Sequence, residues 1–81
     1  PEVGPTDVND LVRTVLKLLA GDATARRVRL DVALEAGLPP VAGDRAQLQQ
    51  LLLNLAVNAL EAADRPDVAE RRVSITTARP T

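Results

Sequence analysis

The chain has 81 residues, enough for one small domain. It contains no Cys, His, Met, Phe, Tyr or Trp, which excludes disulfides, thiolate or imidazole metal sites, histidine acid–base chemistry and aromatic stacking of nucleobases. The formal net charge is −1, and the densest basic cluster, Arg26, Arg27 and Arg29, is interpreted as solvated surface, so no nucleic-acid partner is expected.

The ends and the hydropathy of the chain bear on its location. It begins Pro1-Glu2 without an initiator Met, which suggests a piece of a longer polypeptide. Nothing resembles a signal peptide, and no apolar run approaches the ~20 residues needed to span a bilayer. We therefore expect a cytoplasmic segment without membrane contact.

The first predicted element after an extended lead-in, Pro1 to Thr6, is a helix. Asp7 and Asp10 approximate a capping box at its start. Apolar residues then recur at helical spacing: Val8, Leu11, Val12, Val15, Leu16 and Leu19. Gly21 weakens this pattern, so the helix either stops there or continues toward Arg26, and continuation is favoured.

Two strands are predicted next. Residues Val28 to Leu34 alternate apolar and polar, which is typical of a half-buried strand. Gly37 and the pair Pro39-Pro40 end that strand. Val41-Ala42 leaves room for only a very short second strand.

A long helix and a last strand complete the chain. Asp44 and Gln47 form a D-x-x-Q capping box at the start of a helix that extends to Ala63. A polar loop follows, and Val73 to Ala78 alternate as the last strand. The predicted fold class is α+β, a two-layer α/β sandwich with two helices packed on a small mixed sheet.

Five polar residues on the long helix form what we call the amide stripe: Gln47, Gln50, Asn54, Asn58 and Glu61. At about 100° per residue they fall within an arc of roughly 80°. The rest of the helix is aliphatic nearly all the way round, which predicts burial. The stripe is then either the solvent edge of a packed helix or a ligand site. The side chain of Gln47 either caps the helix or contacts the ligand.

The chemistry of the stripe favours a cation shared with phosphates. Neutral amide oxygens at Asn54 and Asn58, four residues apart, suit a hard cation such as Mg²⁺ that keeps most of its water. Glu61 could ligate, position a water or face solvent. No Gly-rich phosphate loop and no catalytic constellation is present, so the residues alone predict a cation–phosphate site and no complete enzyme.

A family resemblance rests on these residues. The motif resembles the N box of sensor histidine kinases, in the ATP-binding domain of the Bergerat (GHKL) superfamily: Gly43-Asp44, then Leu48-x-Gln50-x-Leu52-Leu53-Asn54-Leu55-x-x-Asn58-Ala59-x-Glu61-Ala62. The helix opening at Asp7 and the segment Leu38-Pro39-Pro40-Val41-x-Gly43-Asp44 fit the same order. The resemblance implies the first half of a Bergerat fold over residues 1–81.

The resemblance also implies roles for single residues. Asn58 matches the Mg²⁺ ligand, and Asn54 stands where ATPases of the superfamily have a catalytic Glu, which favours the kinase branch. Gln50 lines the site or packs the helix. Glu61 matches the N-A-x-E-A subset, often nitrogen- or dicarboxylate-sensing kinases. The implied nucleotide-binding residues are Gln50, Asn54, Asn58 and Glu61.

The implied function is that of a histidine-kinase catalytic domain, which binds Mg-ATP and transfers the γ-phosphate to a histidine. The D-x-G-x-G box, the ATP lid and the phospho-acceptor His are absent from these 81 residues, so the segment alone is expected to be inactive. The implied partners are a dimerisation and phospho-acceptor domain and a response regulator. The alternative is a small non-catalytic interaction module, and in either case exposed strand edges favour a homo-oligomer.

Overall fold

Both helices of the computed structural model, which describes residues 3–67 and 69–79, begin at the aspartates that the sequence predicts. Helix α1 (Val8–Ala25) is capped by the Asp7 carboxylate, which accepts from the amide of Asp10 at 3.1 Å. Helix α2 (Arg45–Ala63) is capped by Asp44, which accepts from two amides of the first turn. The caps satisfy amides that would otherwise lack partners.

The end of α1 settles the question raised by Gly21, because the helix continues through this glycine to Ala25. It ends in a Schellman motif, in which the amide of Val28 bonds the carbonyl of Ala23 and the amide of Arg27 bonds that of Thr24. Arg27 takes the left-handed position of this motif, with φ 57°. Ala23 and Val28 are both buried, which supplies the apolar contact that accompanies such an ending.

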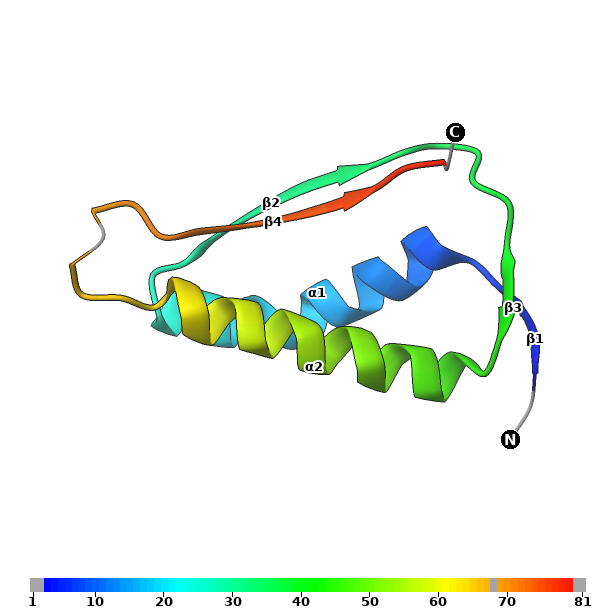
Figure 1. The fold of residues 1–81 in the computed structure, drawn as a ribbon, viewed down its shortest axis with the longest axis horizontal. Coiled ribbons are helices and arrows are strands. Elements are labelled where there is room, and N and C mark those ends of the chain that lie inside the picture. Colours follow the sequence, from blue (N-terminus) through cyan, green and yellow to red (C-terminus); the bar gives the residue numbers. More distant parts are fainter. Residues whose placement is uncertain (1–2, 68, 80–81) are drawn as a thin grey trace.

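Four strands form two pairs, one of each direction. Strands β2 (Arg29–Leu34) and β4 (Arg72–Thr77) pair in parallel, with Arg29 opposite Arg72. Strands β1 (Gly4–Thr6) and β3 (Val41–Gly43) pair antiparallel, with Pro5 opposite Ala42. Figure 1 shows both helices on one side of the β2–β4 pair, with the β1–β3 pair at one end. The α+β class and the packing of two helices on a small sheet are therefore confirmed.

The core lies between the two helices and the inner face of the β2–β4 pair. Its buried members are aliphatic: Val15, Leu19, Ala23, Val28, Ala56 and Leu60. The outer face of the pair is ionic. There the Asp31 carboxylate lies 2.8 Å from the guanidinium of Arg29 and 2.9 Å from that of Arg72. A parallel pair normally has both faces covered, but this ionic face is suited to water.

Two expectations need correction. The lead-in before α1 contains a strand, β1, because Pro5 and its neighbours pair with β3 from the other half of the chain. Helix α2 is not buried nearly all round: only Ala56 and Leu60 are buried, while Leu51 and Leu55 are each 58% exposed. The cause is the two-layer arrangement, which covers α2 only where it faces α1 and β4.

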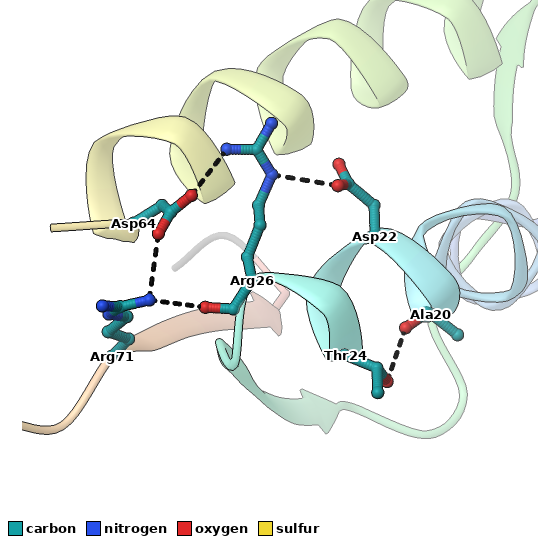
Figure 2. Close-up of polar contacts among 6 residues, drawn as sticks. All are labelled: Ala20, Asp22, Thr24, Arg26, Asp64 and Arg71. Atoms are coloured by element: carbon teal, nitrogen blue, oxygen red, sulfur yellow. Dashed lines mark hydrogen bonds and ion pairs between the residues drawn. The ribbon is translucent and has the colours of Figure 1, made fainter. Parts of the chain in front are cut away.

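Ion pairs join the helices at both ends. Arg45 of α2 lies 3.0 Å from the Asp10 carboxylate of α1 near their first turns. At the other end, Arg26 bridges Asp22 at 2.9 Å and Asp64 at 3.0 Å, as Figure 2 shows. Because α1 and α2 run in the same direction (Figure 1), the partial negative charges of their C-terminal ends lie near each other. The positive charge of Arg26 stabilises this arrangement.

Arg71, the residue before β4, completes this network. Its Nη1 donates to the Asp64 carboxylate at 3.0 Å and to the backbone carbonyl of Arg26 at 2.8 Å (Figure 2). The hydrogen bond to Asp22, with the nearby charges of Asp22 and Asp64, raises the pKa of Arg26. Of the three arginines expected on the solvated surface, Arg27 and Arg29 are exposed, and Arg26 is half-buried with its guanidinium held by two carboxylates.

Candidate functional site

The amide stripe lies on the solvent-exposed side of α2. Gln50, Asn54, Asn58 and Glu61 are all exposed, and they follow one another along the helix at intervals of three or four residues. Because no neighbouring element of the described chain covers them, they need no internal partners. The stripe is thus an open face, available either to water or to a ligand.

One hydrogen bond links two residues of the stripe. The Nε2 of Gln50 donates to the Oδ1 of Asn54 at 3.0 Å. With this bond, the Asn54 amide presents its oxygen to Gln50 and its NH₂ group to the other side. Whether Gln50 lines a site or packs the helix stays a prediction.

Gln47 stands apart from the other four residues. Its backbone amide bonds the Asp44 carboxylate at 3.3 Å, as the predicted cap requires. Its side chain is exposed and has no hydrogen bond within residues 3–67 and 69–79. The reciprocal half of the capping box is thus unformed, and Asp44 alone caps the helix.

Asn58 offers one amide oxygen, a ligand type that hard cations accept. Its side chain is exposed, and no hydrogen bond within the described residues engages it. Among those residues, no group of three or more Asp or Glu could hold a metal ion. A single amide oxygen is a weak ligand alone, so a cation at Asn58 would need most of its ligands from water or from a bound phosphate, which is the usual situation for Mg²⁺.

An apolar groove of about 320 Å³ lies beside the stripe. Its walls come from both helices, β3 and β4, and include Val8, Val41, Leu48, Leu51, Leu55 and Ile75. Leu51 and Leu55 are neighbours of the stripe on the helix surface, so the polar and apolar surfaces meet along α2. The sequence could not separate these leucines from core residues, because their type and spacing match those of Leu52 and Leu53.

The sequence also missed the Arg26–Asp64–Arg71 network at the C-terminal end of the same helix. Asp64 and Arg71 lie in the segment that the sequence assigns to a polar loop, and Asp64 is the C-terminal cap residue of α2. Their side chains are only 32% and 24% exposed. A hint was present in the sequence, since Asp64 follows directly on the last apolar turn of the helix.

Neither helix within the described residues is both long and apolar enough to cross a membrane.

No protein-family model matches the chain. Among characterised proteins, it is similar to the sensor histidine kinase TmoS of Ectopseudomonas mendocina, with 32% identity over 93% of this chain. It is also similar to the sensory histidine kinase/phosphatase NtrB of Rhizobium leguminosarum bv. phaseoli, with 41% identity over 78% of this chain. The chain spans 8% of the length of TmoS and 16% of that of NtrB.

Solved structures agree in fold. The chain is similar to the catalytic domain of histidine kinase ThkA, with a TM-score of 0.78, 26% identity and coverage of 94% of this chain and 49% of that one. It is also similar to ThkA in a complex with the response regulator protein TrrA, with a TM-score of 0.76 and 25% identity over 91% of this chain and 21% of that one. The two helices and their sheet thus have the arrangement of half of a kinase catalytic domain.

Proposed function

Because this chain belongs with the sensor histidine kinases, as a segment homologous to their catalytic domain, we propose that α2 supplies the Mg²⁺–phosphate side of an ATP site. The observation that supports this proposal is the exposed amide stripe. Asn54 and Asn58 stand on one open face of a helix whose other side packs on the core. Two amides on an open face are compatible with a ligand that brings its own charge and water.

Each residue of the stripe has a proposed role. Asn58 would hold Mg²⁺ through its free amide oxygen, and Asn54, oriented by Gln50, would contact the phosphates or their water shell. Glu61 would line the same site. The bound Mg²⁺ would neutralise phosphate charge. An amide does not act as a general base, so these residues bind and orient the nucleotide but do not activate water.

The remaining parts of the reaction lie outside these residues. In the intact kinase, the D-x-G-x-G box and the ATP lid would complete the nucleotide site, and a histidine on a dimerisation domain would accept the γ-phosphate. We place the segment in the cytoplasm, where the phosphohistidine would pass its phosphate to a response regulator. A structural relative, ThkA, is known in complex with such a regulator.

Isothermal titration with MgATP tests this division of the site. The 81-residue chain is expected to give no measurable heat at micromolar nucleotide, because it offers only the phosphate side. In the intact kinase, Asn58→Ala is expected to abolish Mg²⁺-dependent ATP binding. Gln47→Ala is the matched control and is expected to bind as the wild type does, because it removes an exposed amide side chain of the same helix and keeps the backbone bond to Asp44. Micromolar affinity for the isolated chain, or unchanged binding in the Asn58→Ala kinase, would overturn the proposal.

A second candidate function is a non-catalytic interaction module that self-associates. It is favoured by the apolar groove, whose rim leucines Leu51 and Leu55 are more than half exposed. The outer edge of β4 is also unpaired within the described residues, and every residue of the strand after Arg72, from Val73 to Thr77, is uncharged. Exposed apolar surface and an uncharged strand edge both promote association.

Sedimentation equilibrium of the purified chain tests self-association. We expect a concentration-dependent dimer for the wild type and a shift toward monomer for Leu55→Lys, because a charge in the groove opposes burial. Leu18→Lys is the matched control, since Leu18 on α1 is 57% exposed and does not line the groove. A wild-type chain that stays monomeric at the highest concentration would refute this second function.

A further inference from the structure

We propose that the Arg26–Asp64–Arg71 network sets the rotation of α2 about its own axis and so presents the amide stripe to solvent. The network lies at the end of α2 that carries Asn58 and Glu61, which precede Asp64 by six and three residues. None of its residues belongs to the stripe, so they act as positioning residues. Their effect on nucleotide binding rests on the ATP site proposed above, whereas the orientation of α2 is a property of this chain alone.

Apolar packing leaves this rotation weakly defined. Helix α1 buries six of its residues, whereas α2 buries two, Ala56 and Leu60. The other aliphatic residues of α2 surround it nearly completely, and Leu55 is exposed although its side chain would suit the core. Because successive residues of a helix are about 100° apart, a rotation of that size would bring Leu55 to the place of Ala56. A second apolar setting is thus available to α2, and in it the stripe would face a different direction.

The network opposes such a rotation because it holds Asp64 from two directions. Oδ2 of Asp64 accepts from Nη1 of Arg26 at 3.0 Å, and Oδ1 accepts from Nη1 of Arg71 at 3.0 Å (Figure 2). Arg26 follows the last residue of α1 and Arg71 precedes β4, so each oxygen is bonded to a different part of the fold. The carboxylate lies off the axis of α2, and a rotation of the helix would therefore break both contacts.

The two guanidinium groups are themselves held in place. Nε of Arg26 donates to the Asp22 carboxylate at 2.9 Å. Arg71 donates to the backbone carbonyl of Arg26 at 2.8 Å and to that of Arg65 at 3.1 Å. The side chains of Arg26 and Arg71 are only 29% and 24% exposed. An isolated exposed ion pair contributes little, but several charges held in a network contribute more and constrain the geometry.

The location of Asp64 is unfavourable without these partners. Asp64 is the C-terminal cap residue of α2, where the partial negative charge of the helix end repels a carboxylate. The last turn of α2 contains no basic residue that could offset this repulsion, so both cations come from other parts of the chain. Such a carboxylate adds little stability but selects one setting of the helix over another, and specification of register is the best-attested role of polar contacts of this kind.

The test uses the chain with ¹³C-labelled methyl groups and a water-soluble paramagnetic agent, which relaxes methyl groups according to their exposure. At a concentration where the chain is monomeric, the wild type is expected to show fast relaxation at Leu55 and slow relaxation at Leu60, which is fully buried. Asp64→Ala is expected to slow the relaxation of the Leu55 methyls about twofold, because α2 would then populate a second setting that buries this side chain. Local unfolding can only expose a methyl further, so this slowing is specific to rotation.

Two variants serve as controls. Asp67→Ala removes a carboxylate of the following loop, whose ion pair with Arg65 is 66% and 63% exposed on its two sides, and it is expected to relax as the wild type does. Asp64→Glu keeps the carboxylate and is expected to stay closer to the wild type than Asp64→Ala. Unchanged or faster relaxation at Leu55 in Asp64→Ala, or the same slowing in Asp67→Ala, would overturn the proposal. If Asp64→Ala gives no dispersed spectrum, Asp64→Asn, which removes only the charge, is judged by the same outcomes.

The intact kinase separates this inference from the proposed ATP site. There Asp64→Ala is expected to raise the KM for MgATP several-fold while kcat changes little, because Asp64 orients the binding residues without touching the nucleotide. Asp67→Ala is again the control. A rotated α2 with an unchanged KM would overturn the ATP site and leave the positioning role supported, since the methyl measurement contains no nucleotide.

Discussion

At the scale of single residues, Arg27 has a backbone conformation, φ 57°, that favours glycine over a residue with a side chain. Its amide and that of Val28 close the Schellman motif that ends α1. This ending requires one residue in the left-handed region, where any Cβ atom is unfavourable. Helix α1 therefore has a well-formed ending built on an unfavourable residue.

Replacing this residue tests the cost directly. Arg27→Gly is expected to raise the free energy of unfolding by about 0.5–1 kcal/mol, because glycine adopts φ 57° without strain. Urea denaturation followed by circular dichroism measures the change. Arg27→Ala separates backbone from charge, since it removes the guanidinium but keeps the Cβ atom. If the alanine variant gained as much as the glycine variant, charge repulsion with Arg26 would be the cause instead.

The sequence predicted some residue roles well and others not at all. Asp7 and Asp44 were identified as caps because an N-cap depends on local sequence alone. The left-handed ending at Arg27 could not be predicted, since the usual signal is a glycine and none is there. The assignments of Asn54 and Asn58 to a nucleotide site remain predictions, because they rest on the family motif.

At the scale of elements, α2 has two different sides. One side packs on α1 and β4 through Leu60, which is fully buried, and Ala56. The other side exposes the amide stripe and the groove leucines Leu51 and Leu55. The same residue type therefore has two functions on one helix, and position relative to α1 decides which.

Truncation of one leucine on each side measures this difference. Leu60→Ala is expected to lower the free energy of unfolding by about 2–5 kcal/mol, enough to unfold most of a chain this small. Leu55→Ala is expected to change it by less than about 0.5 kcal/mol, because the side chain is 58% exposed. Thermal unfolding at low concentration, where association is suppressed, provides the comparison. Similar losses in both variants would mean that the groove is closed in solution.

The elements themselves were largely predictable. Both helices and the strands β2 and β4 agree with the predicted ranges to within about one residue, since periodicity is a local property. Strand β1 was missed because Gly4 and Pro5 have low strand propensity and pair only through contact with β3. The exposure of α2 was missed for a related reason. The apolar residues of a helix show which surface could be buried, but the actual burial depends on how many other elements pack against the helix.

At the scale of the whole molecule, Asn9 joins three elements. It is only 8% exposed, and its Nδ2 donates to the carbonyl of Glu35, just after β2, at 2.7 Å. Its Oδ1 accepts from the hydroxyl of Thr77, at the end of β4, also at 2.7 Å. The amide of Glu35 donates to the same hydroxyl at 3.0 Å. The start of α1 is thus fixed to the carboxyl ends of both parallel strands.

Removal of this side chain should affect the whole fold. Asn9→Ala is expected to lower the free energy of unfolding by about 1–2 kcal/mol, because it leaves the Glu35 carbonyl and the Thr77 hydroxyl with fewer partners in a half-buried place. Chemical denaturation measures the loss. Thr24→Ala, which removes an exposed hydroxyl from the same helix, is the control and is expected to change stability by less than about 0.5 kcal/mol. A loss below that bound in Asn9→Ala would show that water replaces these bonds.

The parallel pairing of β2 with β4 has a consequence in time. Strand β2 has no partner until β3, all of α2 and the following loop have been synthesised, because β4 comes last. Strands that are distant in sequence pair slowly, because the entropy cost of closing the long loop comes before the stabilising hydrogen bonds form. During translation, at about 5–20 residues per second, β2 waits for seconds with its apolar residues Leu30 and Val32 uncovered. We expect its charged neighbours Arg29 and Asp31 to oppose aggregation of the unpaired strand during this interval, because flanking charges disfavour association of exposed strands.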